Sequence, residues 1–543
     1  MSLEKKSDGF IMQAGILAMA GIICRIIGIL YRSPLAAIIG DEGNGYYGSA
    51  YNIYTIILLI SSYSIPAAIS KVIAGKLALK QYKNAQRIFY CAFIYVIVVG
   101  GVASLFAFFG ARFLVEQKAV MVLRIFSPTI FVSGLLGVLR GYFQAHKTMV
   151  QTSISQILEQ ILNAVISIMA AYLLKQLVID KDASTQAVYG AMGSALGTGA
   201  GVLIALAFMV LMYGINKKEI RERIAKDDHK DILSYKEIFG IIFALVTPFI
   251  LSTFIYNFST SLDETIYRKI LKLVKHVDVS QIAVWYGVYS GKAVVISNIP
   301  IAISSAMSAA MIPSVSGKFA TGDIGGTKGK VHTAILTTML IAIPSAVGIF
   351  VLAEPVVGFL FPGQTNIALA GSLLRALSIT VIFYSLSTLT NAVLQGIGKV
   401  TAPVYHAAIA LAAQTVVLVP CLLFTNLNLY SIAIATIVYS LLMCVLNQLA
   451  VRKYLGYRQN IKKIFVLPMI ASVIMGVCAY FVYQAMHKIS GSNLISLIIA
   501  IIIAACVYGV LVLRLGVLTK EDIEAMPKGK KLAKLLKKLH FIH

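Results

Sequence analysis

Near its beginning the chain reads Gly21-Ile-Ile-Cys-Arg25-Ile-Ile-Gly28-Ile-Leu-Tyr-Arg32-Ser-Pro34. This stretch lies inside an apolar run from Phe10 to Ile39, which as a helix is long enough to cross a hydrocarbon core of about 30 Å. Helical spacing puts Arg25 and Arg32 on one stripe with two glycines, while isoleucine and leucine cover the other faces. Two guanidinium groups therefore share one side of a predicted membrane helix.

An arginine at the centre of a membrane helix costs about 3 kcal/mol on insertion scales and usually faces a bundle interior or a water-filled cavity. We therefore interpret Arg25, near the middle of the run, as a cavity residue. Arg32 lies nearer the helix end. Its side chain either faces the same cavity or extends to the outer membrane interface.

The composition is that of a polytopic membrane protein. Of 543 residues, 59% are hydrophobic and 13% are charged, and the mean hydropathy is +0.85, which excludes a large soluble domain. The net charge of +25 would indicate nucleic acid in a soluble chain, but its distribution among loops gives a simpler explanation, and we predict no nucleic-acid partner. The six cysteines lie in apolar runs without a CxxC pair and predict neither disulfides nor a zinc site.

Apolar segments of spanning length predict about 14 transmembrane helices. They lie near residues 10–39, 46–75, 87–115, 121–145, 150–178, 187–214, 236–262, 280–315, 331–356, 367–396, 402–424, 428–451, 463–486 and 493–515. With the N-terminus inside, and with Arg87, Arg112, Lys175, Lys236 and Lys463 at segment ends assigned to the adjoining loops, 30 of the 47 lysines and arginines fall in cytoplasmic segments, nine in outer loops and eight inside helices. The positive-inside rule then predicts that both termini are cytoplasmic.

Two short motifs in the first half of the chain recur in the second half, and we call each such pair an echo. Residues 65–70 (IPAAIS) return as 299–304 (IPIAIS), and residues 138–141 (VLRG) return as 393–396 (VLQG). Both relate one helix to the sixth helix after it, which is typical of two six-helix repeats. We therefore predict an all-α membrane fold with an N-lobe over 1–215, a cytoplasmic linker or surface helix over 216–235, a C-lobe over 236–451, two extra helices over 452–518 and a basic amphipathic tail over 519–543.

Basic residues outnumber acidic ones inside the predicted helices. Glu159 is the main carboxylate there, whereas the bases are Arg25, Arg32, Lys71, Arg124, Arg140, Lys292, Arg375 and Arg514. Most of these bases lie near helix ends, where extension to the interface is the alternative, but Arg25 and Lys292 do not. A cavity lined by such groups would favour an anion such as a diphosphate.

Two further expectations concern the outer side. The glycine-rich residues 41–48 predict a tight turn between the first two helices, with a flexible outer hinge as the alternative. We interpret Asp263 and Glu264 as a solvated helix end, with a cation site or acid–base chemistry as the alternative. The sequence shows no catalytic constellation, because its histidines are dispersed, its outer loops are short and it lacks a nucleophile elbow and a P-loop. It therefore predicts no enzyme, no cofactor and no metal site.

Four segments resemble the polysaccharide-biosynthesis branch of the multidrug/oligosaccharidyl-lipid/polysaccharide (MOP) flippase superfamily. They are residues 24–32, 65–71, 139–144 and 311–316. Within this branch the whole chain is similar to the stage V sporulation protein B and MurJ-type lipid II flippases. The resemblance implies two six-helix lobes around a V-shaped central cavity, alternating access, and two C-terminal helices that form a groove for a polyprenyl tail.

The resemblance also implies transfer of an undecaprenyl-diphosphate-linked oligosaccharide, foremost lipid II, from the inner to the outer leaflet of the bacterial cell membrane, with a coupling ion or the membrane potential as the energy source. It places Arg25, Lys71 and Lys292 in the cavity, whereas Arg32 departs from the spacing of the Gram-negative members. These four bases are our candidate substrate-binding residues. Three alternatives remain open: a flippase for another lipid-linked polysaccharide unit, a cation or drug antiporter of the same fold, and an envelope polysaccharide polymerase or ligase.

Overall fold

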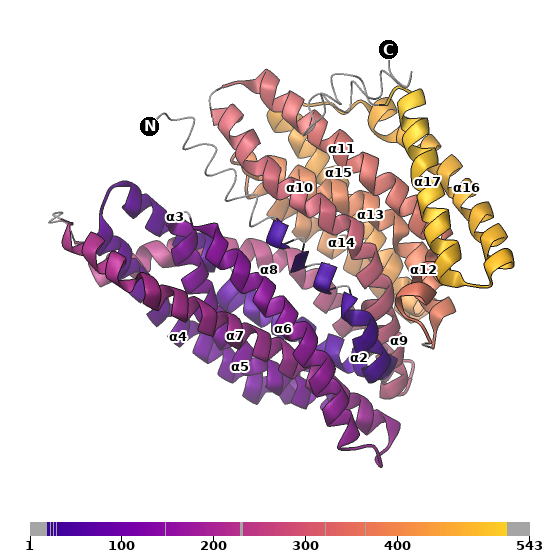
Figure 1. Cartoon of the computed structure of the whole chain (residues 1–543), viewed down its shortest axis with the longest axis horizontal. Helices are drawn as coiled ribbons and strands as arrows, with labels where there is room; N and C mark the ends of the chain where they lie inside the picture. The colour runs from indigo at the N-terminus through magenta and orange to yellow at the C-terminus, as the bar shows by residue number, and fades with distance from the viewer. Residues whose placement is uncertain are drawn as a thin grey trace. The chain divides into compact units, whose positions relative to one another are not determined.

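The computed structural model describes residues 19–517 except residues 22, 25, 29, 64, 147, 228–231, 321 and 364. Every regular element within this part of the chain is a helix. Two compact units divide between Gly287 and Val288. In Figure 1 the helices of the first unit run from indigo to magenta along the chain, and those of the second run on to yellow.

The first unit holds the helices up to most of α9. They are α2 (Arg32–Leu58), the π-helix η1 (Leu59–Tyr63), α3 (Ile65–Ala78), α4 (Tyr82–Leu114), the 3₁₀ turn η2 (Gln117–Ala119), α5 (Val120–Ala145), α6 (Met149–Gln176), α7 (Ala183–Ala225), α8 (Tyr235–Leu273) and α9 (Val279–Val288). The second unit begins with a π-helix. Its elements are η3 (Tyr289–Ala293), α10 (Val294–Ala320), α11 (Ile324–Val351), α12 (Ala353–Leu360), α13 (Ile367–Gly396), α14 (Ala402–Phe424), α15 (Leu429–Leu455), the π-helix η4 (Lys462–Val466), α16 (Leu467–Ser490) and α17 (Asn493–Arg514).

Many of these helices have the length and composition of membrane spans. Ten of the described helices qualify singly, and residues 19–28 and 32–61 together form a bent pair that makes an eleventh. The protein is therefore an all-α, multi-pass membrane protein, as predicted. The count of 14 spans stays a prediction.

The predicted turn at residues 41–48 is wrong. These residues are helical, and the break between the first two predicted spans is confined to Gly40, whose φ of 69° and ψ of 178° suit a glycine. Two of the other glycines serve packing instead. A Cβ on Gly43 would lie 3.0 Å from the carbonyl oxygen of Ala187 in α7, and a Cβ on Gly45 would overlap the carbonyl of Ala283 in α9.

Small residues bring α6 and α7 into close contact. Gly193, Gly197 and Gly201 recur every fourth residue on one face of α7, and a Cβ on any of them would meet the backbone of α6. Glycines at this spacing let membrane helices approach closely enough for their backbones to pack. The α6–α7 pair is therefore closely packed within the first unit.

We expect Gly197→Ala to destabilise the first unit, because the added methyl group would overlap Ser167 of α6 and force the helices apart. Overpacking of this kind costs about 1–3 kcal/mol. Thermal unfolding of the purified protein and its steady-state abundance measure the effect. Gly214→Ala is the matched control, since that position on α7 has nothing within 4 Å of an added Cβ. Equal behaviour of the two variants would contradict close packing.

The two sequence echoes lie in comparable helices of the two units. The first echo, residues 65–70, begins α3 just after π-helix η1, and its counterpart, residues 299–304, lies in α10 after π-helix η3. In the first unit Gly141 of the second echo packs on Pro66, since a Cβ there would lie 2.8 Å from the Pro66 carbonyl oxygen.

The predicted lobe boundary at 216–235 does not coincide with the division at residue 287, and it stays a prediction. Helix α7 continues through the first half of that segment.

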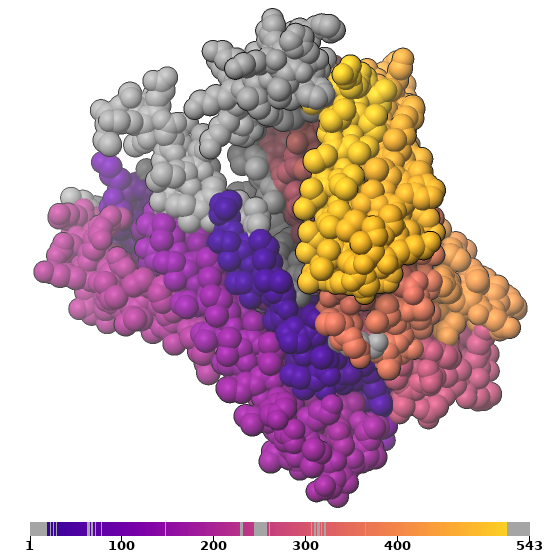
Figure 2. All heavy atoms as spheres, turned by 45° about the vertical axis from the view of Figure 1, so that its right-hand side comes forward, coloured from indigo at the N-terminus to yellow at the C-terminus, as the bar shows by residue number. Residues whose placement is uncertain are grey.

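The last two helices lie side by side at the end of the chain (Figure 1). Their outer faces carry exposed apolar side chains, and Figure 2 shows this pair in yellow as one continuous surface. On α16 these side chains include Ile470, Val473, Ile474, Val477 and Phe481, and on α17 they include Ile498, Ile501 and Ile502. Such a surface is expected where helices face lipid. The basic tail predicted for residues 519–543 lies outside the described residues.

Candidate substrate-binding site

The structure describes two of the four predicted site residues in full. Arg25 lies outside the described residues. Lys71 belongs to helix α3, but its side chain is not among those described. Arg32 begins α2 in the first unit, and Lys292 lies in η3 of the second.

Arg32 is half-buried among tyrosines. Its guanidinium lies within electrostatic reach of the hydroxyl groups of Tyr31, Tyr47 and Tyr51. The rings of Tyr47 and Tyr51 stack with centroids 5.6 Å apart. None of the ion pairs among the described residues joins a carboxylate to Arg32. A guanidinium has five N–H donors and a permanent positive charge. Because the hydroxyls beside Arg32 are neutral, they do not cancel this charge, and the guanidinium can still bind an anion.

Arg140 differs from Arg32 because its charge is neutralised within the unit. Its Nε donates to Ser155 Oγ at 2.8 Å, and one of its terminal nitrogens donates to Glu159 Oε2 at 2.7 Å. The side chain is thus held by α6 and does not need to extend to the membrane interface. Glu159, the main intramembrane carboxylate in the sequence, is the partner of this arginine.

Lys292 is completely buried. It lies in π-helix η3, and its Nζ donates to the carbonyl oxygen of Thr365 at 2.8 Å. The hydroxyl of Tyr289 in the same π-helix lies 3.2 Å from Thr436 Oγ1 on α15. Single π-helical turns occur frequently at functional sites. An ammonium group buried in a membrane protein is costly, which makes Lys292 a functional candidate on physical grounds.

The interpretation of Asp263 and Glu264 as a solvated helix end is wrong. Both residues are only 4% exposed. Arg268, one turn further along α8, is buried too, and its Nε donates to Glu264 Oε1 at 2.8 Å. This stretch of α8 is buried because α9, α2 and the segment before η2 cover it, whereas the last residues of α8, Lys272 and Leu273, are exposed. The Glu264–Arg268 spacing of four residues was the available sequence signal for this pair.

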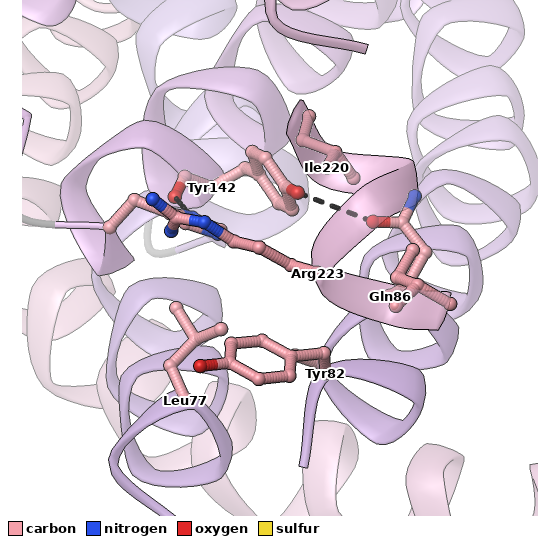
Figure 3. A pocket seen from close by; sticks show the side chains of 9 residues that line it. Leu77, Tyr82, Gln86, Tyr142, Ile220 and Arg223 are labelled. Carbon is pink, nitrogen blue, oxygen red and sulfur yellow. Dashed lines mark hydrogen bonds between the residues drawn. The ribbon is translucent and has the colours of Figure 1, made fainter. Parts of the chain in front are cut away.

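A small pocket that is open to solvent lies in the first unit between α3, α4, α5 and α7 (Figure 3). Its buried polar groups bond one another, because Tyr142 donates to Gln86 Oε1 at 3.3 Å and Gln86 Nε2 donates to Tyr213 at 2.8 Å. Burial lowers the pKa of His146 at its rim. Arg223, which reaches across the pocket in Figure 3, pairs with Glu219. None of the predicted site residues lines this pocket.

Comparisons with known proteins agree with this architecture. The family model described as "Polysaccharide biosynthesis protein" matches residues 11–318, more than half of the chain, and the family model MatE matches residues 291–420. The chain is 24% identical to "Lipid II flippase MurJ" of Bacillus subtilis (strain 168) over 93% of this chain and 95% of that protein.

Two solved structures show the same fold. A structure of the lipid II flippase MurJ in an inward closed conformation has a TM-score of 0.65 and 16% identity, and the match covers 91% of this chain and 97% of that one. A multidrug resistance MATE family transporter of the MOP superfamily in an inward-facing conformation has a TM-score of 0.64 and 16% identity, with coverage of 82% and 98%. The chain belongs to the polysaccharide biosynthesis protein family, and its fold is similar to that of the MurJ structure and of a MATE transporter of the MOP superfamily.

Proposed function

We propose that this protein is a flippase for an undecaprenyl-diphosphate-linked oligosaccharide, with lipid II as its substrate. It moves the lipid from the inner to the outer leaflet of the bacterial cell membrane without changing it chemically, and therefore acts as a transporter and not as an enzyme. Similarity to a lipid II flippase along almost the whole chain supports this proposal.

The surroundings of Arg32 are the main support for a substrate with a negatively charged group. Arg32 is an intramembrane cation whose described neighbours are tyrosine hydroxyls and not carboxylates. Arg140, by contrast, is already paired with Glu159. A diphosphate can accept several charge-assisted hydrogen bonds, two of them from one guanidinium. We assign Arg25, Arg32, Lys71 and Lys292 to binding of this group.

A cation or drug antiporter is the second candidate, because the MatE family model matches residues 291–420. Such a transporter needs an available carboxylate for its cationic substrate. Glu159 is engaged with Arg140 in the first unit, so it does not offer a free negative charge. The substrate's charge therefore separates the two candidates.

Purified protein should bind undecaprenyl-diphosphate sugars at least about tenfold more tightly than a lipophilic cation such as tetraphenylphosphonium, a difference of about 1.4 kcal/mol. Added salt should weaken the binding of the diphosphate lipid, because it screens charges that are accessible to water. Competition binding in detergent measures both effects. Equal or tighter binding of the cation would favour the antiporter.

We also propose that both termini are cytoplasmic, which places the two ends of α7 on opposite sides of the membrane. Lys181 precedes this helix and Lys218 lies in its last turns, and both are exposed. With the six native cysteines replaced by alanine, Lys181→Cys should react in intact cells with a membrane-impermeant maleimide, and Lys218→Cys should react only after cell lysis. The reverse pattern would invert the topology.

A further inference from the structure

One guanidinium connects four segments of the first unit. Besides Glu264 on its own helix, Arg268 donates to Glu116 Oε1 at 2.5 Å, in the segment before η2, and to the carbonyl oxygen of Gly45 at 3.0 Å, in α2. The guanidinium also lies over the ring of Tyr286 in α9, 5.0 Å from the ring centre. All three of its nitrogens therefore have partners, and the partners come from α2, α8, α9 and the α4–α5 connection.

A second group of contacts lies at the start of α9. Lys118 donates to the hydroxyls of Ser184 in α7 and Ser280 in α9, the latter at 3.0 Å. Glu42 in α2 accepts hydrogen bonds from Ser184 at 2.5 Å and from the Tyr46 hydroxyl at 2.6 Å. These contacts connect α9 to α2, α7 and η2.

The backbones of α2 and α9 touch directly between the two groups of contacts. A Cβ on Gly45 would overlap the Ala283 carbonyl, and a Cβ on Gly287 would overlap the Asp41 carbonyl. Because no side chain fills the space between the helices, a small separation would break many contacts at once. Closely packed interfaces of this kind have discrete closed and open arrangements rather than a continuous range.

We propose that Glu42, Glu116, Lys118, Glu264 and Arg268 form a latch that holds α8 and α9 against α2, and that this latch must open during transport. The need to open rests on the proposed function, whereas the holding role does not. Within the latch Arg268 contributes most, because its side chain is 9% exposed and that of Lys118 is 42% exposed. Removing one partner of a buried ion pair is far more disruptive than removing an exposed one.

The holding role is tested by the accessibility of a buried reporter. Ser49 lies one turn beyond Gly45 on α2 and is 6% exposed, and Ser49→Cys is nearly isosteric. In purified cysteine-free protein, Arg268→Ala should increase the rate at which maleimide labels this reporter about tenfold or more. Lys269→Ala, which removes an exposed positive charge from the next position, should leave the rate unchanged. Labelling at the original rate in Arg268→Ala would refute the latch.

A charge exchange separates the latch from general loss of folding. Arg268→Glu should label fast, and adding Glu116→Arg should slow labelling again, because the exchange restores opposite charges at the same contact. Fast labelling in the single and in the double variant would refute a specific contact between residues 116 and 268. These rates are measured without substrate, so they stay informative if the proposed substrate is wrong.

The need to open is tested by fixing α9 to α7, whose Ser184 donates to the latch residue Glu42 of α2. Ser184 and Ser280 each lie 3.5 Å from the Tyr46 hydroxyl, so Ser184→Cys with Ser280→Cys gives two thiols close to one another. Oxidation to the disulfide should abolish flipping of fluorescent lipid II in proteoliposomes, and reduction should restore it. Full flipping by the oxidised protein would refute the need to open, while absence of flipping by the original protein would instead count against the proposed function.

Discussion

Arg32→Ala should abolish growth rescue of cells depleted of their own lipid II flippase, while the protein accumulates at its normal level. A charge-assisted hydrogen bond contributes about 1.5–3 kcal/mol, so loss of a bidentate contact to a diphosphate would weaken binding by about 10²- to 10⁴-fold. Abundance should not fall, because an arginine within a membrane helix is itself costly to insert. Binding of undecaprenyl-diphosphate sugars should fall in parallel with rescue.

Two comparison variants test whether the effect is specific to the guanidinium group and to its position at residue 32. Arg32→Lys keeps the charge but loses the planar fork, so it should rescue growth only partly. Arg124→Ala removes a half-buried arginine near the start of α5 whose guanidinium lies over the Phe108 ring, 5.4 Å from its centre, and it should rescue fully. Full rescue by Arg32→Ala at normal abundance would remove this residue from the binding site.

The fold class and many helix limits could be predicted from the sequence because they depend on local composition. Spans predicted at 367–396 and 402–424 coincide with α13 and α14, and the one predicted at 493–515 differs from α17 by a single residue. Length and hydropathy suffice for such helices, since the bilayer imposes the same requirement on each of them.

Features that depend on tertiary contacts could not be predicted in this way. Glycines 43 and 45 read as turn residues, but they pack against α7 and α9, which come more than a hundred residues later. Asp263 and Glu264 read as solvated, because nothing nearby in the sequence shows that α9 folds back to cover them. The π-helical turn that holds Lys292 has no periodic signature, since it inserts a local widening into an ordinary apolar helix.

The candidate site was predictable to the extent that intramembrane charges stand out in the sequence. The sequence singles out Lys292 as a base away from a helix end and leaves Arg32 open between the cavity and the outer interface, and the structure gives each a distinct environment. What the sequence could not distinguish was which bases are already neutralised. Arg140 and Arg32 look alike in the sequence, but only the folded chain brings Glu159 to Arg140.

Lys292→Met should also abolish growth rescue. Methionine approximates the length and volume of the lysine side chain, so the fully buried site stays filled while the charge is lost. The carbonyl of Thr365 would lose the ammonium donor, a change of about 1–3 kcal/mol that thermal unfolding of the purified protein can measure. If Lys292 binds the substrate, diphosphate-lipid binding should fall by far more than this loss of stability explains.

The matched control is Lys318→Met on α10, which removes an exposed lysine whose Nζ lies 3.2 Å from Asp323 Oδ2. It should leave both rescue and binding unchanged, because exposed ion pairs contribute little. Lys292→Arg should also fail to rescue growth, since the larger guanidinium has no room in a site with no exposed surface. A Lys292→Met protein that binds the diphosphate lipid normally but unfolds at a lower temperature would assign this lysine to the connection between η3 and Thr365, and would leave Arg32 and the other helix bases to bind the anion.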